Sequence, residues 1–196
     1  MALFKFNEVH PPAEEKKSDA GSEKSNSPQS SFSGTGSQVI RDVIGNISQG
    51  ETIHYATSGA WNAHELLEHL LKITGPAKVY LTTWAMSENP VRSILNLIDQ
   101  GLITELNCVF DLKVQDRAPK VFQLIQGISS HVRLVHCHAK VFVIQNDSWA
   151  ISNSGSANWT RNPRMEAGVL SADPIVAEFH KKWIMRLIND EHGTDS

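Results

Sequence analysis

Residues 136–144 read HCHAKVFVI, a stretch in which polar side chains come before an apolar run. Successive side chains of a β-strand point to opposite faces, so we expect His136, His138 and Lys140 on one side. The other side would carry only small or apolar residues: Cys137, Ala139, Val141 and Val143. We expect this second side to pack beneath helices. Because a buried basic pair is costly without partners, an anionic group should meet the first side.

The sequence around this stretch alternates between predicted helices and predicted strands. Apolar residues at helical spacing, with Gly and Pro at the ends, predict helices over 38–47, 58–75, 87–101, 118–126 and 174–189. Short apolar or alternating runs predict strands over 52–57, 78–84, 103–111, 132–135, 139–144, 149–152 and 166–171. This alternation predicts an α/β fold, a layered mixed β-sheet flanked by helices.

The first 36 residues differ in composition from the rest of the chain. Seven of the 22 residues over 15–36 are serine, and Phe32 is the only large apolar side chain among them. Such a segment buries too little surface to offset its conformational entropy. We therefore predict a disordered N-terminal tail over residues 1–36 and one folded domain over residues 37–196.

Composition and charge exclude several classes of protein. Of 196 residues, 40% are hydrophobic and 20% charged, which is typical of a globular chain. The net charge of −3 argues against a strongly basic nucleic-acid binder but allows local basic patches. No run approaches the roughly 20 apolar residues that a membrane span needs. The start lacks a secretory signal pattern, and Cys108 and Cys137 lie in apolar runs, so we predict a cytoplasmic location.

A second polar stretch, SGSANWTRNPRME over residues 154–166, follows the predicted hairpin. The two stretches together contain His-x-Lys, then Gly-Ser-x-Asn, then a glutamate. The matching positions are His138, Lys140, Gly155, Ser156, Asn158 and Glu166. This pattern resembles the signature of the phospholipase D superfamily. The resemblance covers about residues 134–169, and the predicted order of elements over 38–190 is compatible with that family's fold.

The resemblance implies a metal-independent phosphodiesterase that needs no cofactor and forms a phosphohistidine intermediate. His138 would attack phosphorus as a neutral imidazole. The phosphoryl oxygens would be held by Lys140, Ser156 and Asn158. Glu166 would hold the histidine ring in its reactive tautomer. Short members with one motif resemble nucleases more than lipid enzymes, so DNA or RNA is the expected substrate.

The sequence departs from the family pattern at one position. The family places an aspartate five residues after the lysine, and this position is Gln145 here. The nearest acidic residue is Asp147, in the predicted turn, and we keep it as a candidate substitute. The family aspartate is mainly structural, so its loss affects the local geometry more than the nucleophile.

Double displacement needs two histidines, and this chain carries one His-x-Lys followed by Gly-Ser-x-Asn. Small members of the family pair two chains about a two-fold axis, and such an interface places identical residues opposite each other. We therefore expect a homodimer with one composite site.

Several other interpretations stay open. Arg161 and Arg164 follow the motif and either line a solvated loop or bind flanking phosphates of the substrate. His136 and His138 have a spacing that metal ions use, but no acidic or cysteine ligand lies at matching positions, so we expect no metal site. We expect Trp61, Trp84 and Trp159 in the core, although Trp159, beside Asn158, is also a candidate for base stacking. The alternative functions are a non-catalytic nucleic-acid-binding or assembly module and a phospholipid hydrolase.

Overall fold

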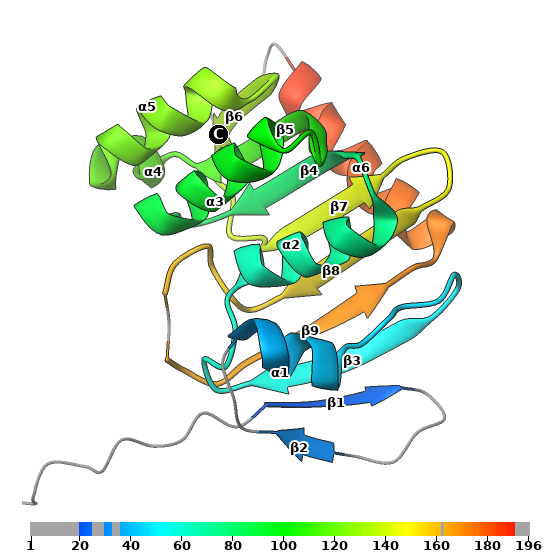
Figure 1. Ribbon diagram of the computed structural model, residues 1–196. Helices are drawn as coiled ribbons and strands as arrows, with labels where there is room; N and C mark the ends of the chain where they lie inside the picture. Colours follow the sequence, from blue (N-terminus) through cyan, green and yellow to red (C-terminus); the bar gives the residue numbers. More distant parts are fainter. Residues whose placement is uncertain (1–19, 25–29, 33–35, 162, 191–196) are drawn as a thin grey trace, which may run out of the picture.

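The computed structural model describes residues 20–24, 30–32, 36–161 and 163–190 (Figure 1). The strands are β1 (Ala20–Lys24), β2 (Ser30–Phe32), β3 (Thr52–Thr57), β4 (Ala77–Thr83), β5 (Ile103–Asp111), β6 (His131–Val135), β7 (Val141–Gln145), β8 (Ala150–Gly155) and β9 (Glu166–Ser171). The helices are α1 (Gly36–Val43), α2 (Ala63–Thr74), α3 (Glu88–Asp99), α4 (Lys113–Arg117), α5 (Pro119–Ile128) and α6 (Pro174–Asn189).

All nine strands belong to one sheet, in the order β2-β1-β3-β9-β8-β7-β4-β5-β6. The pairs β4–β5 and β5–β6 are parallel, and helices make the connections between them, as parallel neighbours require. The other neighbouring strands are antiparallel, and β7 joins the two parts by pairing with β4. The predicted α/β fold with a mixed sheet flanked by helices is therefore confirmed.

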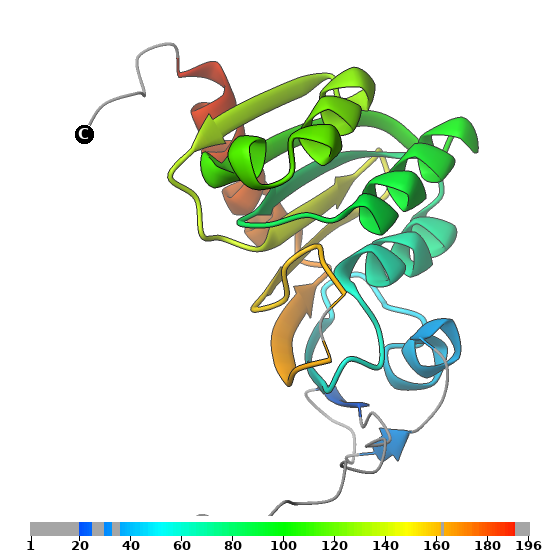
Figure 2. The same ribbon diagram turned by 90° about the vertical axis from the view of Figure 1, so that its left-hand side faces the viewer.

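Helices cover both faces of the sheet. Residues of α1, α2, α3 and α5 form a large core on one face, and α6 forms a smaller core on the other. Figures 1 and 2 show α6, in orange to red, on the opposite side of the sheet from α2 and α3. Along β7, Phe142 and Ile144 belong to the large core, whereas Val141, Val143 and the preceding Cys137 belong to the small one. This confirms the predicted division of the two faces.

Local signals explain where the longer helices begin. The backbone N–H of Asn62, just before α2, donates to Glu65 Oε2 at 2.7 Å, which is half of a capping box. At the start of α6, Asp173 Oδ1 accepts from the N–H of Ile175 at 2.7 Å, and Pro174 occupies the first helical position. Among the described residues, no helix combines the length and the apolar character needed to cross a lipid bilayer.

The structure differs from the predicted elements in several places, among them α1, which ends at Val43 and not at residue 47, and α2, which begins at Ala63 and not at residue 58. The helix α4 was not predicted, β7 begins at Val141 rather than at residue 139, and β8 continues to Gly155. Within the predicted tail, β1 pairs with β3 and β2 pairs with β1, which a fully disordered segment would not contain. The other residues before 36 lie outside the described part of the chain, so the tail over 1–36 and its boundary stay a prediction.

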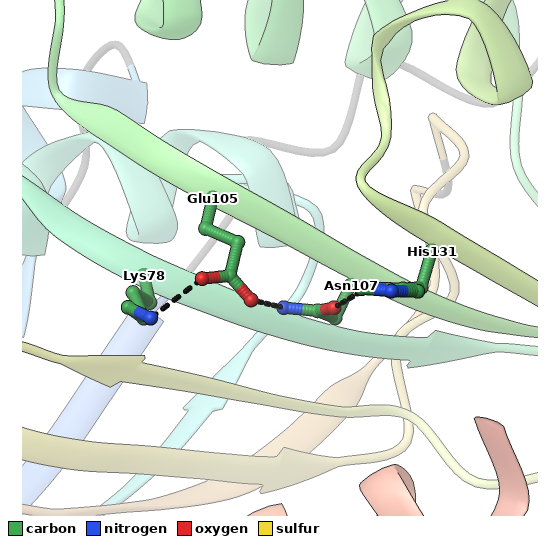
Figure 3. A network of polar contacts seen from close by, with 4 residues as sticks. All are labelled: Lys78, Glu105, Asn107 and His131. Atoms are coloured by element: carbon green, nitrogen blue, oxygen red, sulfur yellow. Dashed lines mark hydrogen bonds and ion pairs between the residues drawn. The ribbon is translucent and has the colours of Figure 1, made fainter. Parts of the chain in front are cut away.

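A chain of polar contacts crosses the first residues of the parallel strands, at the far end of the sheet from the motif (Figure 3). Lys78 Nζ lies 2.6 Å from Glu105 Oε2, and Asn107 Nδ2 donates to Glu105 Oε1 at 2.9 Å. Asn107 Oδ1 in turn lies 2.9 Å from His131 Nδ1. The bond from Lys78 lowers the pKa of Glu105. These contacts satisfy the amide of Asn107, which is fully buried.

Candidate active site

The segment that carries the first motif, residues 136–140, lies between β6 and β7 and is not part of a strand. The prediction of a strand from residue 139 is therefore wrong at its start. The backbone is held by side chains from neighbouring strands instead of by a ladder of strand hydrogen bonds. The side chains still alternate, since His136 and His138 are exposed and Cys137 is buried between them. Lys140 lies on the same side as His138, as predicted, although its side chain is buried.

Two buried polar residues at the ends of β4 and β5 hold this segment. Asp111, the last residue of β5, accepts from the N–H of Cys137 at 3.3 Å and from the N–H of Lys113 at 3.1 Å. Thr82 Oγ1 accepts from the N–H of Val141 at 3.1 Å, and Thr82 also lies 3.2 Å from the carbonyl oxygen of Ala139. His138 therefore stands on a segment that is tied down on both sides.

Lys140 lies directly against His138. Its Nζ donates to the carbonyl oxygen of His138 at 2.7 Å and lies 3.2 Å from Nδ1 and 3.3 Å from Nε2 of the ring. Burial lowers the pKa of Lys140, while Cys137 and Glu166 act in the opposite direction. A neutral imidazole has only one acceptor nitrogen, so at most one of the two ring contacts is a hydrogen bond. The pair thus combines an exposed imidazole with a buried ammonium group.

The second motif reaches the same place from β8 and β9. The N–H of Gly155, the last residue of β8, donates to the carbonyl oxygen of Lys140 at 3.1 Å. The N–H of Ser156 donates to the carbonyl oxygen of Ala167 at 3.0 Å, and the N–H of Ala167 donates back to Ser156 Oγ at 3.1 Å. Ser156 Oγ in turn donates to Glu166 Oε2. Ser156 and Glu166 are therefore brought together at the end of the sheet that carries Lys140.

Glu166 accepts a hydrogen bond from Ser156, whereas the resemblance implied that it would hold the ring of a histidine. The contacts of the His138 ring within the described residues are with Lys140 and Trp84, and no hydrogen bond joins it to Glu166. The predicted hold of Glu166 on a histidine ring stays a prediction. In the single chain this carboxylate orients the hydroxyl of Ser156.

Asn158 is tied to the end of β4. Thr83 Oγ1 lies 3.4 Å from Asn158 Oδ1, and the N–H of Trp159 donates to the carbonyl oxygen of Ala85 at 3.1 Å. Trp159 itself is only 1% exposed and packs against the ring of Phe142. It belongs to the core, so its interpretation as a base-stacking side chain is wrong.

A buried tyrosine forms a hydrogen bond inside the fold, next to the residues of the two motifs. Tyr55 of β3 donates to Asn153 Oδ1 at 2.9 Å, and burial raises the pKa of Tyr55 to about 12, so this hydroxyl stays neutral. A cavity of about 20 Å³ lies beside these residues and is also lined by Lys140. This volume has room for about one water molecule. Lys140 is therefore largely shielded from bulk water, beside a cavity that aromatic and polar side chains line together.

The remaining predicted residues lie on the outside. Arg161 and Arg164 are exposed, and neither makes an ion pair with another described residue. Asp147 lies in the turn after β7, two residues beyond Gln145, and the five residues of β7 alone span about 17 Å. Its role as a substitute for the family aspartate stays a prediction. The turn is tied instead by Asn146, whose Oδ1 accepts from the N–H of Trp149 at 2.8 Å.

No group of three or more His, Cys, Asp or Glu side chains is placed to share a metal ion in the part of the chain that the structure describes. At the end of the sheet that carries His138, the ammonium of Lys140 and the amide of Asn158 are donors that can bind an anion. The hydroxyl of Ser156 donates to Glu166 in the single chain and would have to turn from that carboxylate to bind an anion. Donors of this kind can bind a phosphate group and stabilise added negative charge on its oxygens.

Sequence reasoning missed four residues at this site: Thr82, Trp84, Asp111 and Arg117. Trp84 was expected in the core, but it is half-buried and its ring centroid lies 5.7 Å from that of His138. Their place in the chain could have indicated three of them, because Thr82, Trp84 and Asp111 stand at or just after the carboxyl ends of the parallel strands β4 and β5. In sheets with parallel strands, ligands bind outside those ends.

No family model and no curated protein matches the sequence. Among solved structures, the chain is similar to NucT from Helicobacter pylori, with a TM-score of 0.48 and 15% identity over 62% of this chain and 86% of that one. It is also similar to Nuc from Salmonella typhimurium, a phospholipase D family member, with a TM-score of 0.49 and 16% identity over 67% and 91% of the two chains. For phosphatidylserine synthase from Haemophilus influenzae the TM-score is 0.47, with 13% identity over 71% and 39%.

Proposed function

We propose that the protein is a metal-independent phosphodiesterase that cleaves DNA or RNA through a phosphohistidine intermediate. The observation that carries the proposal is the contact between His138 and Lys140, in which the lysine Nζ lies 3.2 Å and 3.3 Å from the two ring nitrogens. A nucleophile is thereby held beside a fixed cation, at the end of the sheet where Ser156 and Asn158 also lie. The sequence motif supports the same reaction through its resemblance to the phospholipase D superfamily.

The proposed reaction has two displacements. A ring nitrogen of His138 attacks phosphorus, and the bond from phosphorus to the leaving oxygen breaks as a second imidazolium protonates that oxygen. Water then attacks phosphorus and gives its proton to the second imidazole, and the N–P bond breaks. Lys140, Ser156 and Asn158 stabilise the charge on the phosphoryl oxygens in both steps. Glu166 acts as a positioning residue, and Ser156 is one of its contacts in the single chain.

The second imidazole is proposed to be His138 of another copy of the chain. Each chain has one complete motif, and a two-fold interface brings two such motifs face to face. His138 is exposed, as a side chain that completes its site across an interface must be before the copies meet. The free, buried thiols of Cys108 and Cys137 support the proposed cytoplasmic location, since thiols stay reduced in that compartment.

Hydrolysis of bis-p-nitrophenyl phosphate in millimolar EDTA tests the chemistry. His138→Ala should lower kcat by several orders of magnitude because it removes the covalent nucleophile. His136→Ala is the matched control, since this exposed histidine lies two residues away, and it should retain turnover. Acid quenching of the wild-type protein should trap acid-labile phosphate on His138.

The outcomes separate the proposal from its alternatives. Loss of activity in EDTA together with loss in His136→Ala would replace the proposal with a metal site at the two histidines. Binding of oligonucleotides without turnover would indicate the non-catalytic module. Headgroup release from phospholipid vesicles, without cleavage of DNA or RNA, would indicate a lipid hydrolase.

A further inference from the structure

We propose that Trp84 and Arg117 form a subsite that binds a second phosphate of a polynucleotide, next to the phosphate that is cleaved. The proposal rests on the proposed function and narrows its substrate to a chain with at least two neighbouring phosphates. Neither residue belongs to the motif, and they come from the segment after β4 and from α4.

Trp84 is fixed beside the proposed nucleophile. It directly follows β4, and the segment that carries it is tied to the second motif. The N–H of Ser87 donates to the carbonyl oxygen of Trp159 at 2.9 Å, and Met86 forms a parallel β-bridge with Trp159. The indole ring lies 5.7 Å from the His138 ring, at an interplanar angle of 56°. Trp84 is half-buried, so the residue remains partly open to solvent beside His138.

Arg117 is held over this ring. Its Cζ lies 4.8 Å from the ring centroid of Trp84, within the range of a cation–π interaction. The residue is exposed, and its guanidinium group makes no ion pair within the described residues. The indole orients this arginine, and its N–H donors stay unpaired among the described residues. It can therefore bind an anion through bidentate hydrogen bonds.

The position of this guanidinium group decides which anion it binds. Lys140 already lies against His138, at the phosphate that is attacked, whereas Arg117 contacts the indole and has no contact with His138 or Lys140 among the described residues. We infer that the two cations serve two phosphates of one strand and not two oxygens of one phosphate. A phospholipid with a single phosphodiester would leave Arg117 unused, whereas DNA and RNA carry a charge at every nucleotide.

Chromogenic nucleotides with one or two phosphates test the subsite. Thymidine 5′-(p-nitrophenyl phosphate) is compared with its 3′-phosphorylated form, and thymidine 3′-(p-nitrophenyl phosphate) with its 5′-phosphorylated form. In one of these pairs the added phosphate should raise kcat/KM of the wild-type protein on the order of ten- to a hundredfold, since it forms charge-assisted hydrogen bonds. Arg117→Ala should reduce that gain to about twofold or less.

The matched control is Arg92→Ala, which removes the same charge from an exposed arginine that is paired with Glu88 on α3. Arg92→Ala should keep the increase in kcat/KM that the second phosphate gives. Trp84→Leu should reduce the gain as well, and Trp84→Phe should restore part of it because an aromatic face remains. Melting temperatures of all variants check that the fold is kept.

The experiment distinguishes failure of the subsite from failure of the proposed function. If the wild-type protein hydrolyses none of these nucleotides, the proposed function is wrong and the subsite falls with it. If the protein hydrolyses them but the second phosphate gives no gain in either pair, the subsite is wrong and the phosphodiesterase stands. The subsite is also wrong, and the phosphodiesterase stands, if Arg117→Ala keeps the full increase in kcat/KM that the second phosphate gives.

Discussion

Lys140 is a cation directly before β7, and only 8% of its surface is exposed. Burying an ammonium group is unfavourable unless acceptors replace the lost water. Here the carbonyl oxygen of His138 accepts one hydrogen bond at 2.7 Å, and a water-sized cavity lies beside the side chain. The result is a charge that is already stripped of most of its water where the proposed phosphate binds. Electrostatic stabilisation of a transition state is strongest for groups held in this way.

The pH dependence of the reaction should report on this lysine. Burial lowers the pKa of Lys140, so the side chain loses its proton at a lower pH than an ordinary lysine does. Because the proposed role needs the charged form, kcat/KM should fall on the alkaline side, with a midpoint below 10.5, the usual pKa of lysine. Lys140→Arg should move this alkaline fall beyond the measurable range, since a guanidinium stays protonated. An unchanged alkaline profile in Lys140→Arg would contradict the assignment.

At the scale of elements, the site depends on close packing between β3, β8 and β9. Gly168 of β9 pairs with Gly155 of β8 and with Tyr55 of β3. A Cβ atom on Gly168 would overlap the ring and hydroxyl of Tyr55, and one on Gly155 would lie 3.0 Å from the carbonyl oxygen of Ala167. The missing side chains thus leave room for the tyrosine that donates to Asn153 beneath the motif.

Gly168→Ala should therefore destabilise the fold by about 1–3 kcal/mol, the usual cost of overpacking a filled interior. Gly127→Ala is the control, because a Cβ atom there meets nothing within 4 Å and the residue lies in α5. In a helix this second change should stabilise by up to about 1 kcal/mol. Urea unfolding of the two variants measures both free energies. Equal effects of the two substitutions would refute the packing argument.

At the scale of the whole molecule, one chain presents one set of the proposed groups, all at one end of the sheet. This end lies at the left in Figure 1 and faces the viewer in Figure 2. It is formed where β4 and β5 end and where β7 and β9 begin, so the sheet itself gathers the two motifs. A two-fold axis near this end would bring two such sets together.

The proposed dimer predicts how mixtures behave. Light scattering at micromolar concentration should give about twice the chain mass of 21.7 kDa. If the composite site needs two His138 side chains, a wild-type chain paired with His138→Ala is inactive. After the subunits of an equal mixture have exchanged, activity should then be about a quarter of the wild-type value and not half. A fully active monomer, or activity proportional to the wild-type fraction, would exclude the composite site.

The amino-acid sequence by itself determined most elements of this fold, though not α4, β1 or β2, and the residues of its motif. The bounds of β3, β5, β9 and α6 agree with those predicted from apolar spacing and from Gly and Pro signals. Such signals are local, because a strand or helix that packs on a core repeats its apolar residues along its own length. For the same reason the sequence separated the two faces of β7 correctly.

Only the tertiary structure decided which distant residues meet. Trp84, Arg117 and His138 come from three segments of the chain, and nothing in their local patterns indicates that they lie together. The same is true of the bond from Ser156 to Glu166 and of Thr82, whose hydroxyl bonds to the backbone of Ala139 and Val141 where β7 begins. These contacts depend on strand order and register, which arise from packing across the whole sheet and not from any one stretch of sequence.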